Sequence, residues 1–254
     1  MNLTSPECKT DLSSDEYMKL DMEIFQAIKG YRLASLGEKG INSIVDRLNL
    51  EPFYEFLLHF NSANDRPYHN LYHAQCMLLN CYEGAWHLNV EADELRGLCA
   101  AALLHDFGHS GGIKTDVENI AEALQGLKQA QTFAKFRLVP LSTVSLEIAA
   151  NAIKATVYPF VYTPRTTTEC LIRDADLMQA YEESSFKLIK QYVGLKREIE
   201  LQRQVTFTSE EFAAGMKKFL DTEVEWYTEW ARSKATERNW ELAKSNLYNM
   251  LKDL

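Results

Sequence analysis

Long apolar runs and an excess of positive charge are both missing from this sequence. Its 254 residues include 27 Lys and Arg against 36 Asp and Glu, which gives a formal net charge of −9. A broad nucleic-acid-binding surface needs an excess of basic residues, so this class of partner is not expected. No stretch has the length of an apolar membrane span, and the N-terminus lacks the basic and then apolar pattern of a signal peptide. We therefore expect a cytoplasmic protein that binds no membrane.

Cysteine clusters and strand patterns are scarce as well. The five cysteines are scattered and lack the spacing of a zinc cage, which favours reduced thiols. The alternation of apolar and polar residues that is typical of strands is nearly absent, and residues 205–208 are its only short candidate. Apolar residues at helical spacing predict an all-α fold instead. Helices are expected near Ser14, from Ile41, from Pro52, across residues 91–105, after a cap at Thr115 or Asp116, and across residues 142–156.

The main group of chemically active side chains follows one apolar stretch. Leu98–Leu104 leads directly into His105-Asp106-Phe107-Gly108-His109. An imidazole and a carboxylate side by side can bind one divalent metal ion. If a helix continues this far, His105 and His109 share a face, one turn apart. A His-Asp pair buried at the end of a core helix is the alternative.

Two further segments carry groups of the same kind. His69 and His73 lie at the start of a predicted helix, which would put both on one face. Asp174 and Asp176 lie inside an apolar helical stretch, which is costly unless the carboxylates are paired or bind a metal. Both segments are therefore candidates to complete a metal site with the His-Asp pair.

These segments together resemble a known superfamily. His73, His105-Asp106 and Asp176, in this order along an all-α chain, are similar to the H…HD…D signature of the HD-domain metal-dependent phosphohydrolases. Residues 68–74 resemble the Tyr-His-Asn-x-x-His-Ala motif of the class I cyclic-nucleotide phosphodiesterases, and residues 105–111 resemble their His-Asp-x-x-His-x-Gly motif. Residues 116–119, 153–156 and 173–177 are similar to a group of small predicted HD phosphohydrolases.

The resemblance covers about residues 60–200 and implies an HD-domain helical bundle with a two-metal site. The expected organisation is a single domain over residues 1–254, with a C-terminal helical extension over residues 201–254. The aromatic residues of that extension are compatible with a homodimer.

The resemblance also implies a set of ligands for two divalent metal ions. His73, His105, Asp106 and Asp176 bind the first ion, and Asp106 bridges to the second, with His109 beside its water. Nitrogen and oxygen ligands suit Zn²⁺, Mn²⁺, Fe²⁺ or Mg²⁺ alike. A hydroxide held between the two ions then attacks phosphorus.

In the implied mechanism His69 is the general acid that protonates the leaving oxygen. A carboxylate such as Glu118 is expected to keep His69 charged. Asp174 is expected to pair with Arg173 or with a neighbouring Lys rather than with the metal.

Substrate-binding residues are less clearly indicated. The phosphodiesterases hold the purine with a glutamine well downstream of the last metal-binding Asp, next to a Phe. Here the last glutamine, Gln204, lies 28 positions beyond Asp176, and Gln204 with Phe207 would be a displaced version of that pair. The weaker candidates to contact a small phosphorylated nucleotide are Asn70, Arg66, Lys114, Glu118, Gln204 and Phe207.

Three functions are consistent with these features. The leading one is a metal-dependent phosphohydrolase that cleaves a cyclic-nucleotide-type phosphodiester. The second is a nucleotidase or pyrophosphohydrolase that acts on linear nucleotides or an alarmone. The third is a catalytically silent HD scaffold that binds a nucleotide.

Overall fold

The computed structural model describes residues 38–178, 185–237 and 240–252, and these residues form helices and no strand. The residues expected to form a strand at 205–208 are a loop, and the helix expected near Ser14 lies outside the described residues. None of the described helices has both the length and the apolar character needed to cross a membrane. The helices are α2 (Glu38–Arg47), α3 (Glu51–Phe60), α4 (Leu71–His87), α5 (Ala92–Leu104), α6 (Asp116–Phe136), α7 (Thr143–Ala155), α8 (Thr167–Leu177), α9 (Ser185–Arg203), α10 (Ser209–Thr222), α11 (Glu229–Glu237) and α12 (Trp240–Lys252).

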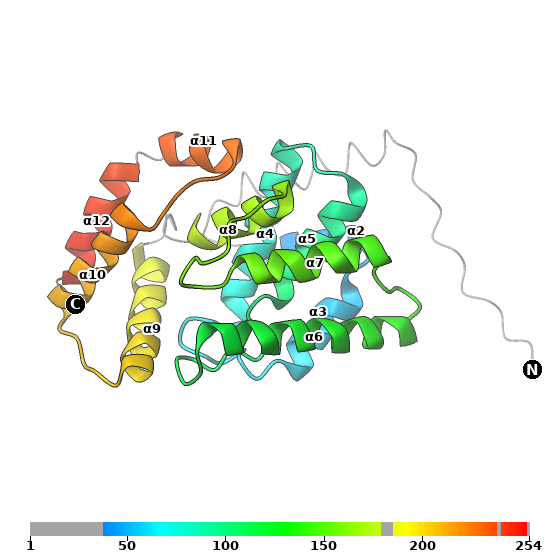
Figure 1. The fold of residues 1–254 in the computed structure, drawn as a ribbon, viewed down its shortest axis with the longest axis horizontal. Coiled ribbons are helices and arrows are strands. Elements are labelled where there is room, and N and C mark those ends of the chain that lie inside the picture. Colours follow the sequence, from blue (N-terminus) through cyan, green and yellow to red (C-terminus); the bar gives the residue numbers. More distant parts are fainter. Residues whose placement is uncertain (1–37, 179–184, 238–239, 253–254) are drawn as a thin grey trace, which may run out of the picture.

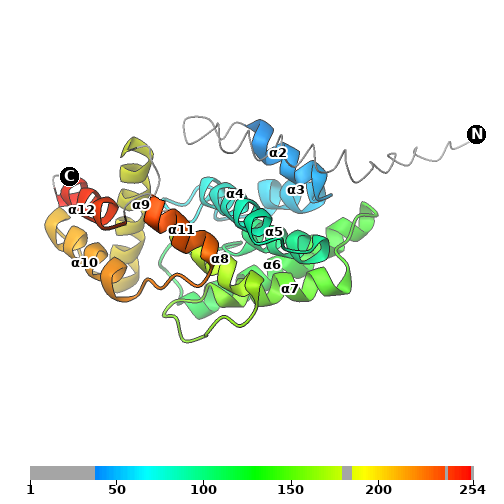
Figure 2. The ribbon, with the colours of Figure 1, turned by 90° about the horizontal axis from the view of Figure 1, so that it is seen from above.

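Helix α5 is the centre of the larger bundle. Its last seven residues, Leu98–Leu104, are at most 1% exposed, as expected for a helix that is apolar on all sides. Helices α3, α4, α6, α7 and α8 all pack against it, and Figures 1 and 2 show them arranged around it. Because α5 is enclosed in this way, the polar residues that follow Leu104 emerge deep inside the protein.

The C-terminal helices form a second, smaller core. Helices α9, α10 and α12 bury an apolar cluster of their own, which includes Tyr192, Phe212 and Leu247. They lie together at one end of the molecule (Figure 1). Helix α11 returns to the main bundle, where Trp230 is 2% exposed. This tryptophan therefore packs against the main bundle rather than in the C-terminal cluster.

Most of the predicted helix starts are confirmed by capping geometry. Thr115 caps α6 through a capping box with Glu118, and Ser142 caps α7 by accepting a hydrogen bond from the N–H of Ser145. Pro52 lies in the first turn of α3, where its missing N–H costs no hydrogen bond. These local signals explain why the helices around the site begin where they do.

Candidate active site

The segment after α5 leaves the helix at once. Helix α5 ends at Leu104, and two tight turns follow it. In the first turn Phe107 N–H donates to Leu104 O, and in the second His109 N–H donates to Asp106 O. The donor and acceptor are 3.0 Å apart in both hydrogen bonds. Gly108 lies between them with a φ of 73°, which glycine adopts without strain. The prediction that His105 and His109 share one helix face is therefore wrong, because the helix ends before either residue.

The start of α4 also differs from the prediction. Asn70 is the N-cap, and its side chain accepts a hydrogen bond from the N–H of His73. His69 therefore precedes the helix and does not share a helix face with His73. The turn still brings their rings together, with centroids 5.7 Å apart. Asn70 thus fixes where the helix begins, and it also donates to the carbonyl of Arg66.

Three of the predicted metal ligands converge on one point. His73 Nε2 and His105 Nε2 lie 2.9 Å apart, and Asp106 Oδ2 lies 3.0 Å from the first and 2.9 Å from the second. Adjacent ligands of an octahedral ion with bonds of about 2.1 Å lie about 3.0 Å apart. The spacing of these three atoms fits the coordination shell of one ion.

Three other features favour a cation at this point. Asp106 Oδ2 is buried and makes no hydrogen bond of ordinary geometry, and the two imidazole nitrogens lie beside it. His105 Nδ1 lies 3.0 Å from the carbonyl oxygen of Ala102, which fixes the proton there and leaves Nε2 as a ligand. Burial lowers the pKa of His73, but Asp106 and Asp176 outweigh it and raise that pKa to about 10. The pocket therefore stabilises positive charge.

The fourth predicted ligand lies at the edge of this cluster. Asp176 Oδ1 is 3.3 Å from His73 Nε2, and the Asp176 side chain is 30% exposed, whereas His73 is 1% exposed. Asp174, two residues earlier, accepts hydrogen bonds from the N–H groups of Tyr227 and Thr228. The expected pairing of Asp174 with Arg173 or a Lys is therefore wrong: Asp174 holds the loop before α11.

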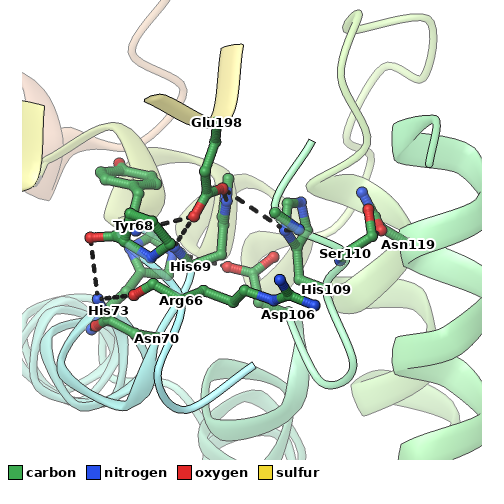
Figure 3. A network of polar contacts seen from close by, with 12 residues as sticks. Arg66, Tyr68, His69, Asn70, His73, Asp106, His109, Ser110, Asn119 and Glu198 are labelled. Carbon is green, nitrogen blue, oxygen red and sulfur yellow. Dashed lines mark hydrogen bonds and ion pairs between the residues drawn. The ribbon is translucent and has the colours of Figure 1, made fainter. Parts of the chain in front are cut away.

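A second polar cluster lies beside the first and is built around Glu198 (Figure 3). Its Oε2 lies 2.5 Å from His69 Nδ1, and its Oε1 accepts hydrogen bonds from the N–H of Tyr68 at 2.9 Å and of His69 at 3.3 Å. Glu198 comes from α9 and is 2% exposed. Burial lowers the pKa of His69, but the charges of Asp106 and Glu198 outweigh it and hold that pKa above its usual value.

Glu198 takes the role that the sequence analysis gave to Glu118. Glu118 is occupied at the surface, where its carboxylate accepts hydrogen bonds from the N–H and hydroxyl of Thr115. The expectation that Glu118 keeps His69 charged is wrong for this reason.

His109 completes the second cluster. Its ring lies on that of His69, with centroids 3.6 Å apart, and its Nδ1 accepts a hydrogen bond from the N–H of Gly111. Burial, and then the charge of His69, lower the pKa of His109 to about 4. His109 is therefore neutral and carries its proton on Nε2. The ligand atoms of His69, His109 and Glu198 are also close enough to form a second metal-binding group.

Two asparagines hold the loop between these clusters. Asn61 Oδ1 accepts a hydrogen bond from the N–H of Gly108 at 2.8 Å, and Asn119 Oδ1 accepts one from the N–H of Ser110 at 3.1 Å. These bonds fix the chain on both sides of His109. Asn61 was not predicted as a site residue, because its local signal is only an asparagine that directly follows a helix.

The weaker substrate candidates are scattered. Lys114 pairs with Glu122 at the surface, and Phe207 packs against the C-terminal cluster. Gln204 is exposed, just after α9, with a φ of 53°. Arg66 is half-buried, and its stem lies against Gly111 in the loop that carries His109.

No family model matches the chain, and no curated protein matches it in sequence. Its fold is similar to the phosphodiesterase domain of the RhoPDE fusion protein from the choanoflagellate Salpingoeca rosetta, with a TM-score of 0.62, 15% identity, and coverage of 96% of this chain and 93% of that chain. A second structure, the phosphodiesterase domain of Salpingoeca rosetta rhodopsin phosphodiesterase, gives a TM-score of 0.59 at 16% identity and covers 96% of this chain and 88% of that chain. The chain therefore has the all-helical fold of a phosphodiesterase domain, as its motifs predicted.

Proposed function

We propose that the protein is a divalent-metal-dependent phosphohydrolase that cleaves a cyclic-nucleotide-type phosphodiester. One observation carries the proposal: the converging ligand atoms of His73, His105 and Asp106 lie beside a His69–Glu198 pair. A metal cluster and an adjacent protonated imidazole are the two components that hydrolysis of a phosphodiester requires. The phosphodiesterase-like fold supports the same reaction class.

The proposed ligands of the first ion are His73, His105, Asp106 and Asp176. The donor set of two imidazoles and two carboxylates suits a divalent transition metal or Mg²⁺. Bound ions would supply an activated water and offset the charge on the phosphoryl oxygens. Asp106, whose charge raises the pKa of His69 in the second cluster, is the carboxylate that we propose would also hold a second ion.

The chain's own groups provide the proton transfer. Because His69 Nδ1–H is held by Glu198, His69 Nε2 is the atom that can donate to the leaving oxygen of the substrate. The His69 side chain is 21% exposed, whereas that of Glu198 is 3% exposed. His109 contributes a neutral Nε2–H beside it, which can orient a water or a phosphoryl oxygen.

A second candidate function is hydrolysis of a linear nucleotide or an alarmone. The positions of two residues, Gln204 and Phe207, favour it. Gln204 is exposed and Phe207 packs in the C-terminal cluster, so this pair is a poor candidate for a purine clamp. The base and the phosphate number of the substrate therefore remain part of the test.

The test is a hydrolysis panel with added Mn²⁺ and chromatographic detection of products. It contains cyclic nucleotides, cyclic dinucleotides, nucleoside mono- and triphosphates and an alarmone. The variant Asp106→Ala removes a metal ligand, and Asp46→Ala, which removes an exposed carboxylate on α2, is the matched control.

Cleavage of a cyclic phosphodiester that is lost in Asp106→Ala and kept in Asp46→Ala would support the proposal. If only linear nucleotides are hydrolysed, with release of phosphate or pyrophosphate, the second candidate function is supported instead. A protein that hydrolyses nothing, contains no metal and is not stabilised by Mn²⁺ would refute both and indicate a silent scaffold.

A further inference from the structure

The guanidinium of Arg66 lies next to the proposed active site, and its buried Nε has no acceptor among residues 38–178, 185–237 and 240–252. The backbone on either side is well fixed, since Arg66 N–H donates to Ala63 O and Arg66 O accepts from Asn70. The backbone of Arg66 is thus held in place, and no residue in the described part of the chain accepts a hydrogen bond from its buried Nε.

The side chain lies against the loop that carries His109. A Cβ on Gly111 would come within 3.0 Å of Arg66 Cδ and 3.6 Å of Arg66 Nη1, and Gly111 has a φ of 65°. Glycine therefore allows both the turn and the close approach of the arginine. In Figure 3 the side chain extends from the segment before α4 towards the loop that carries His109 and Ser110.

Two other arginines of the described residues, half-buried Arg96 and buried Arg173, have their donors bound by carbonyl oxygens. Arg96 donates to the carbonyl oxygens of four residues, and Arg173 donates twice to the carbonyl of Ala155. Asp106 faces the two metal-binding histidines and Glu198 binds His69, and neither of these carboxylates forms an ion pair with Arg66. The fold therefore leaves the donors of Arg66 available.

An unpaired guanidinium is costly to bury unless an anion reaches it. Its planar set of five donors matches the oxygens of a phosphate group better than any other common biological anion except a carboxylate. An arginine that remains unpaired beside a cluster suited to phosphate chemistry is therefore best explained by an acceptor that arrives with the ligand.

We propose that Arg66 is the phosphate-binding residue of this site and contacts a phosphate group of the substrate or of the product. This inference rests on the proposed function, because it uses the neighbouring metal cluster to identify the anion as phosphate. It assigns to Arg66 a role in binding rather than in proton transfer. Removal of Arg66 then weakens binding of the phosphate group and leaves the metal site intact.

The probe is inorganic phosphate, and the readout is the shift that it causes in the thermal unfolding midpoint, measured with Mn²⁺ and again with a chelator. The variants are Arg66→Gln, which removes the charge, and Arg66→Lys, which keeps the charge without the planar donors. Arg137→Gln is the matched control, because Arg137 lies after α6 and pairs with Glu55 at the surface. Metal content and hydrolysis are measured on every variant.

We expect Arg66→Gln to bind phosphate about 10- to 100-fold more weakly than the wild type, the range for loss of a hydrogen bond to a charged group. Arg66→Lys should be intermediate and Arg137→Gln unchanged. Without phosphate, Arg66→Gln should unfold at the same temperature as the wild type or higher, since an unpaired buried donor is removed. A rise in KM for the hydrolysed nucleotide would identify the substrate's phosphate as the ligand, and loss of phosphate inhibition alone would identify the product's.

An equal response of Arg66→Gln and wild type to phosphate would overturn the inference, whatever the hydrolysis panel shows. A lower unfolding temperature with an unchanged phosphate response would instead assign Arg66 a structural role. If the panel shows no hydrolysis and no metal, but the phosphate response still depends on Arg66, then the proposed function fails and the anion site stands.

Discussion

Replacement of Glu198 tests whether the second cluster performs proton transfer. In Glu198→Gln the side-chain amide oxygen can still accept the N–H groups of Tyr68 and His69, which both bind Oε1. The amide NH₂ then faces His69 Nδ1, where the carboxylate oxygen Oε2 had been. Two donors cannot face each other, so His69 must lose the proton on Nδ1, and with it the positive charge. The general acid becomes a neutral imidazole.

The structure gives the size of the effects. A hydrogen bond to a charged group contributes about 1.5–3 kcal/mol, so Glu198→Gln should cost about 2 kcal/mol of stability. Glu198→Ala also leaves two backbone N–H groups without an acceptor, at about 1 kcal/mol each, so it should cost about 4 kcal/mol. General acid catalysis contributes about 10²–10⁴-fold, so kcat should fall by at least about 100-fold in both variants.

The assay separates proton transfer from folding and from metal binding. We would measure kcat on the nucleotide phosphodiester that the hydrolysis panel identifies. The second substrate is a nitrophenyl phosphodiester, whose leaving group needs no proton. Glu198→Gln should lose activity only on the first, and its metal content should equal that of the wild type. Glu200→Gln is the matched control on the same helix, because Glu200 accepts from Lys196 and from the N–H of Phe207, away from His69. A Glu198→Gln enzyme with the kcat and pH profile of Glu200→Gln would refute the reasoning.

The grouping of three candidate metal ligands could be predicted because its signals are local. His105 and Asp106 follow a run of apolar residues that can only be a buried helix, and His73 follows a capping asparagine. The prediction depended on the type and the order of these residues, and it did not depend on the conformation of the turns between them. The two predicted shared helix faces were wrong for local reasons. Asparagine is favoured at the N-cap over the helix interior, so α4 begins after Asn70 and leaves His69 outside it. Helix α5 ends at Leu104, before His105 and His109.

The partner of His69 could not be predicted in the same way. Glu198 lies 129 positions from His69 and belongs to an amphipathic helix rich in Glu, Lys and Arg. Nothing local distinguishes it from Glu200, which makes a surface ion pair on the same helix. Only the packing of α9 against the segment before α4 selects one carboxylate, since Gly194 lies so close to Pro67 O that a Cβ there would be 2.2 Å from it. Long-range packing of this kind has no signature in a single sequence.

Three further predictions concern the loop, the metal and the pH dependence. Asn61→Ala should weaken metal binding about 10-fold or more, because the N–H of Gly108 beside Asp106 loses its acceptor. Asn61→Asp keeps an acceptor oxygen and should restore most of the metal affinity. Equal affinities of the wild type and both variants in a chelator-competition titration would contradict the prediction. Removal of divalent ions with a chelator should lower the unfolding temperature of the wild type and have little effect on Asp106→Ala; equal shifts would mean that the ions bind elsewhere. The third prediction follows from the signs of two pKa shifts. Burial raises the pKa of Glu198, but bonding to His69 outweighs it and holds that pKa below its usual 4.5, so the stabilisation from Glu198 is present above pH 4.5 and is lost as the pH falls through the folded pKa. The pKa of His69 lies above its usual 6.5, so the stabilisation from His69 is complete below pH 6.5 and is lost as the pH rises through the folded pKa. The stability difference between wild type and Glu198→Gln, measured by urea unfolding in chelator, should therefore be largest between pH 4.5 and 6.5 and should shrink on both sides. A difference that is constant with pH would show that His69 and Glu198 do not form a charged pair.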